Sequence, residues 1–188
     1  MLSTLGIMWL KFKLTSRLSV ILSMRNTLAG CILLVTGFLS CSKIGKPAPS
    51  FSFTSINNEV IDSETLKSKI IVVNVWATWC HTCIKEIPDL NRLQAKYAED
   101  TSVVFIGLCD ESPEIMKPML NRFPFNYKQV ANAESYTSKL QTRLVKTYPQ
   151  NVIIDHNFEV VYEVSDGSSD IYSALDSKLQ ELIKSQTK

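Results

Sequence analysis

The apolar positions of this chain form runs that predict a series of strands. Two runs are apolar almost throughout, Ile70–Trp76 and Ser102–Leu108. Runs of this kind are typical of strands buried on both faces of a sheet. Three further strands are expected at Tyr127–Val130, Asn151–Asp155 and Glu159–Val164, the last of which alternates as one arm of a hairpin does.

Apolar residues that recur at helical spacing predict helices between and after these strands. One stripe begins just after Cys80 and places its helix against the sheet; it is made of Ile84, Ile87, Leu90, Leu93 and Tyr97. A second stripe lies near the end of the chain and is made of Ile171, Leu175, Leu179, Leu182 and Ile183. Two more helices are expected at Ser112–Arg122, which Pro118 should break or kink, and at Glu134–Lys146, with Leu140, Leu144 and Val145 on one face.

A short β-hairpin is expected ahead of the first long strand. Phe51-Ser52-Phe53 alternates, Asn57-Asn58 is a turn signal, and Val60-Ile61 can pair back. Asp62 or Ser63 can then cap a short helix that runs through Leu66.

Residues 1–41 have the pattern of a bacterial lipoprotein signal peptide. Counted from Met24, Arg25 forms a short basic region, Leu28–Leu39 is apolar, and Ser40 precedes Cys41. In such peptides the cysteine is lipidated and becomes the new N-terminus. We therefore expect translation to start at Met24 and lipid to be attached to Cys41. A linker follows at 42–50, rich in proline and lysine, and the folded domain spans residues 51–188.

Two alternatives to this assignment stay open. Cys31, in Leu28-Ala29-Gly30-Cys31, matches a lipidation motif better by letters, but the apolar run Ile32–Leu39 would then remain on the mature protein. The other alternative is an uncleaved signal anchor, for which the run is short, since a membrane-spanning helix needs about 20 residues. Under each of these interpretations the domain is attached to a membrane and lies on its outer side.

The composition is that of an ordinary globular protein. The 188 residues are 45% hydrophobic and 20% charged, which excludes a disordered or collagen-like chain. A formal net charge of +2 gives no argument for a nucleic-acid partner, and none is expected. The five cysteines are more informative, because an odd number requires a separate explanation for each.

Two of these cysteines lie where a buried strand leads directly into a helix, in V-V-N-V-W-A-T-W-C-H-T-C-I-K-E-I-P, residues 72–88. Backbone N–H groups at a helix start have no intrahelical partners and carry partial positive charge. They stabilise a thiolate, so the pKa of a cysteine placed there falls. The spacing of Cys80 and Cys83 lets the second thiol close onto the first, which is the chemistry of reversible disulfide exchange. A four-cysteine zinc site would need a second close pair, and the sequence has none.

This stretch resembles the active site of the thioredoxin superfamily, in particular its membrane-attached TlpA/ResA-like branch. That branch has roughly the pattern N-F-W-A-T-W-C-x-x-C-x-x-E-x-P. This chain matches it, with Val75 in place of the phenylalanine, at Asn74, Trp76, Ala77, Thr78, Trp79, Cys80, Cys83, Glu86 and Pro88. The resemblance covers about residues 45–188. It implies an α/β fold, a thioredoxin-like three-layer sandwich with an N-terminal β-hairpin extension.

The resemblance also implies roles for residues around the cysteines. Glu86 would exchange a proton with Cys83, three positions away on the same helix face; helix periodicity alone favours a solvent-exposed glutamate. Pro149, in P-Q-N-V-I-I-D, occupies the position of the family's cis-proline and would place Tyr148 next to the cysteines. The alternative is a trans-proline at a strand start. Trp79 and Tyr148 would flank the groove that receives the client protein.

Two further positions need their own interpretation. Asn74 stands where thioredoxin carries a buried aspartate that helps to move protons, and an amide does not titrate. Cys109 ends the second long strand and is interpreted as a packed, inert core thiol. A resolving or metal-binding role for Cys109 is the alternative.

The leading functional interpretation is an extracytoplasmic thiol–disulfide oxidoreductase that uses Cys80 and Cys83 and needs no cofactor. The resemblance implies that it reduces disulfides of client proteins, for example in apocytochrome c maturation, and is recharged by a membrane thiol-electron donor. A copper-binding assembly factor is a second possibility, but only His81 and His156 could supply its histidine, and such proteins space their cysteines one residue wider. A thiol peroxidase is a third, although its P-x-x-x-T-x-x-C loop is missing. No metal site is expected.

Overall fold

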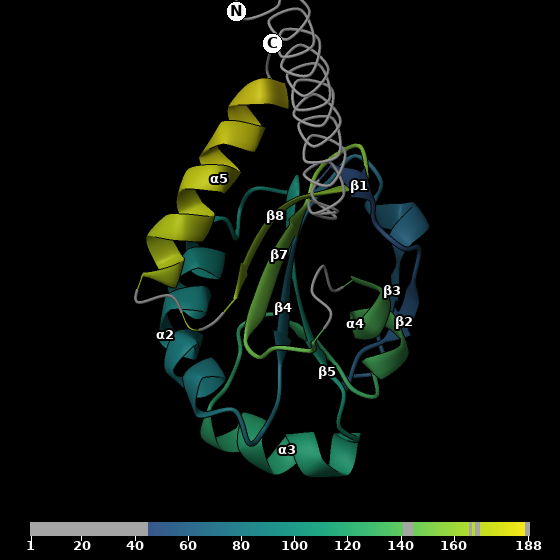
Figure 1. Ribbon diagram of the computed structural model, residues 1–188, viewed down its shortest axis with the longest axis vertical. Helices are drawn as coiled ribbons and strands as arrows, with labels where there is room; N and C mark the ends of the chain where they lie inside the picture. Colours follow the sequence, from purple (N-terminus) through teal and green to yellow (C-terminus); the bar gives the residue numbers. More distant parts are fainter. Residues whose placement is uncertain (1–44, 141–144, 166, 168–169, 187–188) are drawn as a thin grey trace, which may run out of the picture. The chain divides into compact units, whose positions relative to one another are not determined.

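A six-stranded mixed sheet forms the centre of the domain, in the order β1-β8-β7-β4-β5-β6 (Figure 1). The computed structural model describes residues 45–140, 145–165, 167 and 170–186. The strands of this sheet are β1 Lys46–Pro47, β4 Ile70–Trp76, β5 Val103–Cys109, β6 Lys128–Val130, β7 Gln150–Ile154 and β8 Glu159–Ser165. Every strand predicted from the apolar runs is therefore present, with its ends within about one residue of those expected.

Strand β4 occupies the middle of the sheet. It pairs in parallel with β5 and antiparallel with β7, and all seven of its residues are buried. A strand that is paired on both edges and covered on both faces has no contact with water, so a continuous apolar run such as Ile70–Trp76 suits it. Asn74 is the polar exception, and it lies opposite Asn151 in the register of β4 and β7.

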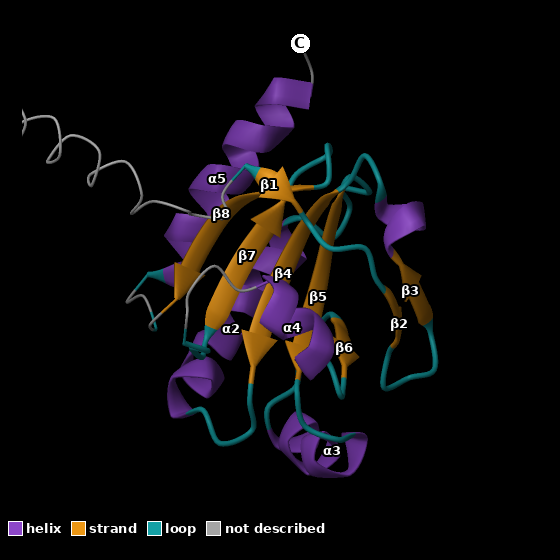
Figure 2. Ribbon diagram, turned by 45° about the vertical axis from the view of Figure 1, so that its right-hand side comes forward, coloured by secondary structure: helices purple, strands orange, loops and turns teal. Residues whose placement is uncertain are grey.

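Helices and a hairpin cover the two faces of the sheet, which gives three layers (Figure 1). One face carries α2 and α5, whose apolar stripes pack on the sheet side by side. The other face carries α4 and the β2–β3 hairpin, while α3 lies across the end of the sheet where β4 and β5 finish (Figure 2). These elements are α2 His81–Lys96, α3 Pro113–Arg122, α4 Glu134–Leu140, α5 Ile171–Gln186, β2 Ser52–Thr54 and β3 Val60–Asp62. The predicted three-layer α/β sandwich with an N-terminal hairpin is confirmed.

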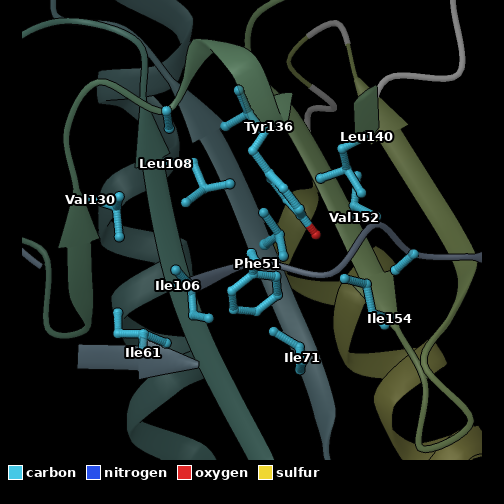
Figure 3. Close-up of a cluster of buried hydrophobic side chains, with 14 of the residues drawn as sticks. Phe51, Ile61, Ile71, Ile106, Leu108, Val130, Tyr136, Leu140, Val152 and Ile154 are labelled. Carbon is cyan, nitrogen blue, oxygen red and sulfur yellow. The ribbon is translucent and has the colours of Figure 1, made fainter. Parts of the chain in front are cut away.

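The hairpin extension is part of the core on its face of the sheet (Figure 3). Phe51 stacks on Phe53 with ring centroids 4.6 Å apart, and Tyr136 of α4 meets Phe51 edge-on at 5.3 Å. These rings belong to the same buried cluster as Ile71 of β4 and Ile106 of β5. Aromatic rings bury large apolar areas, so the hairpin is held by packing although it forms a separate two-stranded sheet.

Polar residues near the hairpin set where the next short helix begins. The 3-10 helix η2, Ser63–Leu66, is capped by Asp62, whose Oδ1 accepts a hydrogen bond from the Glu64 N–H at 2.8 Å. Of the two capping residues that the sequence offered, Asp62 is therefore the one used.

The expected break of α3 at Pro118 is absent, because the helix runs from Pro113 to Arg122. An internal proline removes one backbone hydrogen bond. In α3 the fully buried Met116 anchors the helix on the sheet end and offsets that loss. Helix α2 likewise continues through Pro88.

The interpretation of residues 42–50 as a linker needs correction at Lys46–Pro47. These residues form β1, which pairs with β8 and places Lys46 opposite Val160. A proline fits there because β1 is an edge strand, where a missing N–H costs no hydrogen bond within the sheet. Ala48, which follows, is buried in the core.

The described part of helix α4 runs to Leu140, and residues 141–144 lie outside the described ranges. Val145 was expected on the apolar face but is 72% exposed, and Lys146 forms an ion pair with Asp110 instead of continuing a helix. The side chain of Asp110, contributed from the loop after β5, thus draws this segment toward the end of the sheet.

No helix in the described residues is long and apolar enough to span a bilayer. Residues 1–41, with Met24, Cys31 and Cys41, fall outside the described ranges. The signal peptide and the lipid anchor therefore stay predictions.

Candidate active site

Cys80 and Cys83 form a disulfide where β4 leads into α2. Cys80 is the N-cap residue of α2, and its Sγ accepts a hydrogen bond from the Cys83 N–H at 3.1 Å. This sulfur therefore faces the unpaired N–H groups and the positive dipole end of the helix. The same contact favours a thiolate on Cys80 once the disulfide is reduced.

The disulfide lies just below the surface, beside an exposed aromatic ring. Cys80 is 5% exposed and Cys83 is 2% exposed, whereas the adjacent Trp79 is 69% exposed. Both cysteines pack in a small apolar cluster with Trp76 and Met116. A large exposed apolar side chain next to a reactive group is a natural contact for a partner.

Tyr148 and Pro149 lie in a second loop, which packs against Trp79 and the cysteines. The Tyr148–Pro149 peptide bond is cis, which confirms the prediction. The rings of Trp79 and Tyr148 meet nearly at right angles with centroids 5.2 Å apart, and Tyr148 also packs against the cluster that contains the cysteines. The structure thus brings together Trp79, Tyr148 and the dithiol from two loops that are far apart in the sequence.

The carboxylates of two adjacent residues hold the loops that contain Trp79 and Tyr148. Glu111 accepts hydrogen bonds from the Thr78 N–H at 2.6 Å and from the Thr78 hydroxyl at 2.8 Å. Asp110 accepts a hydrogen bond from the Tyr148 hydroxyl at 2.5 Å and forms an ion pair with Lys146. Burial and the bond to Asp110 raise the pKa of Tyr148, so its hydroxyl remains a donor. One segment after β5 therefore fixes both sides of the site.

Glu86 is buried on the face of α2 that also buries Cys83, which excludes the solvent-exposed interpretation. Its Oε2 accepts a hydrogen bond from Asn151 Nδ2 at 3.0 Å, and its Oε1 is buried without a hydrogen-bond partner among the described residues. Burial raises the pKa of Glu86 to about 7, although the bond from Asn151 opposes the rise and the charge of Asp89 adds to it. A carboxyl group with a pKa near neutrality can both accept and release a proton.

Cys109 is a free, fully buried thiol at the end of β5. Burial raises its pKa to about 12, so the thiol remains protonated at neutral pH. Its Sγ lies 3.5 Å from Glu111 Oε2 as a hydrogen-bond donor. These properties support the interpretation of Cys109 as an inert core residue. Within the described ranges, no group of three or more histidine, cysteine, aspartate or glutamate residues could hold a metal ion.

Two glycines allow close approaches next to the site. The Gln129 side chain lies against Gly107, where a Cβ atom would collide with it, and Gln129 Oε1 can then accept the Trp76 indole N–H at 2.8 Å. Gly167 has a φ of +65° and lies against the Thr82 side chain, where a Cβ atom would again collide. Gly167, after β8, therefore lies close to Thr82, one of the two residues between the cysteines.

The sequence interpretation did not identify Asp110, Glu111 or Asn151 as parts of the site. A usable signal existed for the two carboxylates, because the ends of neighbouring parallel strands meet at one edge of a sheet, and Asp110 directly follows β5. For Asn151 the only signal was an amide within an otherwise apolar strand. Its partner Asn74 lies 77 positions earlier, so the pair becomes visible only in the register of the sheet.

The chain belongs to the AhpC/TSA family, whose model matches residues 44–163. A thiol-disulfide oxidoreductase from Bacillus cereus, ResA, is 30% identical over 122 residues, which cover 65% of this chain and 69% of that protein. A thiol:disulfide interchange protein from Haemophilus influenzae, DsbE, is 37% identical over 81 residues, which cover 42% of this chain and 43% of that protein.

Solved structures share the fold. A putative protein disulfide isomerase from Bacteroides thetaiotaomicron superposes with a TM-score of 0.69 at 20% identity, over 77% of this chain and 92% of that one. A putative DsbE from Chlorobium tepidum gives a TM-score of 0.64 at 22% identity, over 74% of this chain and 96% of that one. The predicted thioredoxin-like fold is confirmed, and the protein is a thiol–disulfide oxidoreductase of the ResA and DsbE type.

Replacing Glu86 by glutamine should remove one source of pH dependence from folding stability. The pKa of Glu86 is about 7 in the folded protein, whereas in an unfolded chain it has its ordinary value of 4.5. The stability that this proton contributes is therefore complete below about pH 4.5 and is lost as the pH rises toward 7. Glutamine does not titrate, so denaturant unfolding at several pH values should show a flatter profile for Glu86→Gln. The exposed Glu99→Gln is the matched control and should keep the wild-type profile; identical profiles for all three proteins would contradict a titrating Glu86.

Proposed function

We propose that this protein is tethered to the outer side of a membrane and reduces disulfides of client proteins with Cys80 and Cys83. The observation that carries the proposal is a cysteine pair at the start of α2 with a buried carboxyl group, Glu86, on the same helix. The placement outside the cytoplasm and the lipid on Cys41 are supported by the signal-peptide pattern. Clients such as apocytochrome c are supported by the resemblance to the TlpA/ResA-like branch.

The proposed reaction has two exchange steps. The Cys80 thiolate attacks one sulfur of the client disulfide, which forms a mixed disulfide and releases the other client sulfur as a thiolate. Cys83 then gives its proton to Glu86 and attacks Cys80 Sγ, which releases the second client thiolate. The client gains two electrons, and the cysteine pair returns to the disulfide. A membrane thiol-electron donor must reduce this disulfide before the next cycle.

The client is proposed to bind across Trp79, Tyr148 and Pro149. Trp79 projects from the surface, and its edge-to-face contact with Tyr148 makes a continuous aromatic wall next to Cys80. Aromatic side chains supply large contact areas at small entropic cost, which suits a site that accepts segments of several clients. Asp110 holds Tyr148 in place and so preserves the shape of this wall.

The proposed direction, reduction of the client, is supported by the charges around the cysteines. Strong oxidants of this superfamily stabilise the thiolate strongly, which favours their reduced form. They usually place a histidine immediately before the second cysteine, where this chain has Thr82. Ionised Glu86 adds negative charge near the dithiol, which disfavours a thiolate. Both features move the couple toward a more reducing potential.

The two cysteines should differ in their ability to trap clients. Cys83→Ser should accumulate stable mixed disulfides through Cys80, because the second exchange step cannot occur. Cys80→Ser should trap none, because the attacking thiol is lost. Non-reducing electrophoresis with mass spectrometry measures both variants, with wild type as the control. The reverse pattern would refute the assignment of attack to Cys80.

The reduction potential of the Cys80–Cys83 couple should lie near that of thioredoxin, about −270 mV. The measurement is equilibration of the protein with glutathione buffers, followed by separation of the reduced and oxidised forms. A potential near that of the strong periplasmic oxidant DsbA, about −120 mV, would sink the proposed direction.

The mature protein should carry lipid on Cys41. Cys41→Ser should leave an unprocessed precursor, while Cys31→Ser, the matched control at the competing position, should be processed normally. Intact mass and partitioning into detergent report both properties. A Cys41→Ser protein with the same processing and partitioning as wild type would be incompatible with this anchor.

A further inference from the structure

A line of buried polar side chains connects Glu86 to strands β7 and β4. Asn151 Nδ2 donates to Glu86 Oε2 at 3.0 Å, and Asn74 Nδ2 donates to Asn151 Oδ1 at 2.9 Å. The hydroxyl of Tyr127 completes the line by donating to Asn74 Oδ1 at 3.3 Å. Asn74 and Asn151 are 2% and 1% exposed, so they cannot exchange these bonds for bonds to bulk water.

The sheet register holds the two amides together. Asn74 and Asn151 are direct partners in the antiparallel pairing of β4 and β7. Their side chains are on the face that packs on α2, since their neighbours Val72 and Ile153 belong to the cluster on that face. Burying two amides in an apolar sheet is costly unless each is hydrogen-bonded. Their presence is therefore explained by the hydrogen bonds they make: Asn151 binds the carboxyl group of Glu86, and Asn74 binds Asn151.

We propose that Asn151 and Asn74 are positioning residues of the dithiol reaction, which hold the Glu86 carboxyl in one orientation and tune its exchange of protons. This inference rests on the proposed role of Glu86 in taking the proton of Cys83. Asn151 donates directly to the carboxylate and so favours its ionised form. Asn74 acts one step away, because it accepts from Tyr127 and donates to Asn151, which fixes which end of the Asn151 amide faces Glu86.

The line orients a carboxyl group but does not conduct protons, because an amide does not titrate. The protonation state of Glu86 decides which group donates and which accepts in each hydrogen bond of the line. An ionised carboxylate only accepts, so Asn151 must present its NH2 group. A protonated carboxyl can donate; each amide can then turn over, and the Tyr127 hydroxyl accepts at the far end. Glu86 therefore keeps a hydrogen bond in both protonation states, as a group that cycles between them requires.

Other groups near Glu86 also affect the ionisation of its carboxyl group. Asp89 on α2 disfavours the carboxylate by its charge, and burial does so more strongly. The Tyr127 hydroxyl is neutral, because burial and the charge of Glu86 raise its pKa well above the ordinary value. Cys83 lies one turn earlier on α2. Among these groups, Asn151 is the one whose contact favours ionisation of Glu86.

The test is the double variant Asn74→Leu/Asn151→Leu in the full chain, solubilised in detergent. Leucine has nearly the shape of asparagine, and changing both residues leaves no buried amide unpaired. The carboxyl carbon shift of Glu86 against pH measures its pKa, which should rise from about 7 by about one pH unit or more. The rate of mixed-disulfide resolution should need a correspondingly higher pH. Asn74→Leu alone should give a smaller rise in the same direction.

Two controls separate positioning from general damage. Gln150→Leu changes a buried polar residue next to Asn151 whose side chain bonds Glu163 instead, so the pKa of Glu86 should stay unchanged. In a Glu86→Gln background, the double variant should not move the pH profile of resolution. An unchanged pKa of Glu86 in the folded double variant would overturn this inference and leave the dithiol function intact. A raised pKa of Glu86 with an unmoved resolution profile would overturn the role of Glu86 in resolution itself, and with it the inference.

Discussion

The burial of strand β4 on both faces and both edges is the constraint on which the site depends. Hydrogen bonds to β5 and β7 set its register, and the apolar cores on the two faces exclude any slip, which would move its side chains to the wrong face. The end of β4 is therefore a fixed point. Cys80 comes four residues after that end and is the N-cap of α2, so the sheet fixes where the disulfide lies.

The same sheet brings distant polar residues to the cysteines. Parallel pairing of β4 and β5 places Asp110 and Glu111 beside the loop that contains Thr78, and antiparallel pairing of β4 and β7 places Asn151 opposite Asn74. Each of these polar groups would be costly to bury alone, and each has a partner supplied by another strand or loop. The site is thus a set of paired polar groups at one end of an apolar sandwich, and its rigidity comes from the apolar part.

Glu86 shows how that arrangement becomes chemistry. A glutamate on the exposed side of α2 would titrate like any solvated carboxyl group. Here the helix turns it inward, where burial moves its pKa to about 7 and Asn151 gives the charged form a partner. Burial and hydrogen bonding act in opposite directions, and their balance leaves a group that changes charge near neutral pH. The role proposed for Glu86 requires that balance, and helix spacing alone could not reveal it.

The spacing of apolar residues is a local signal, and it was sufficient to predict most of the strands and helices. The runs of β4 and β5 were predicted within about a residue, and the apolar stripes of α2 and α5 and the cysteine pair at a strand-to-helix junction were also predicted. Errors occurred where a distant contact outweighed a local rule, as in α3, which continues through Pro118, and in β1, which pairs with β8. The surroundings of the site were decided only by the tertiary structure. Asn74 and Asn151 are 77 positions apart, and neither has a local signal for the other, because register is a property of the whole sheet.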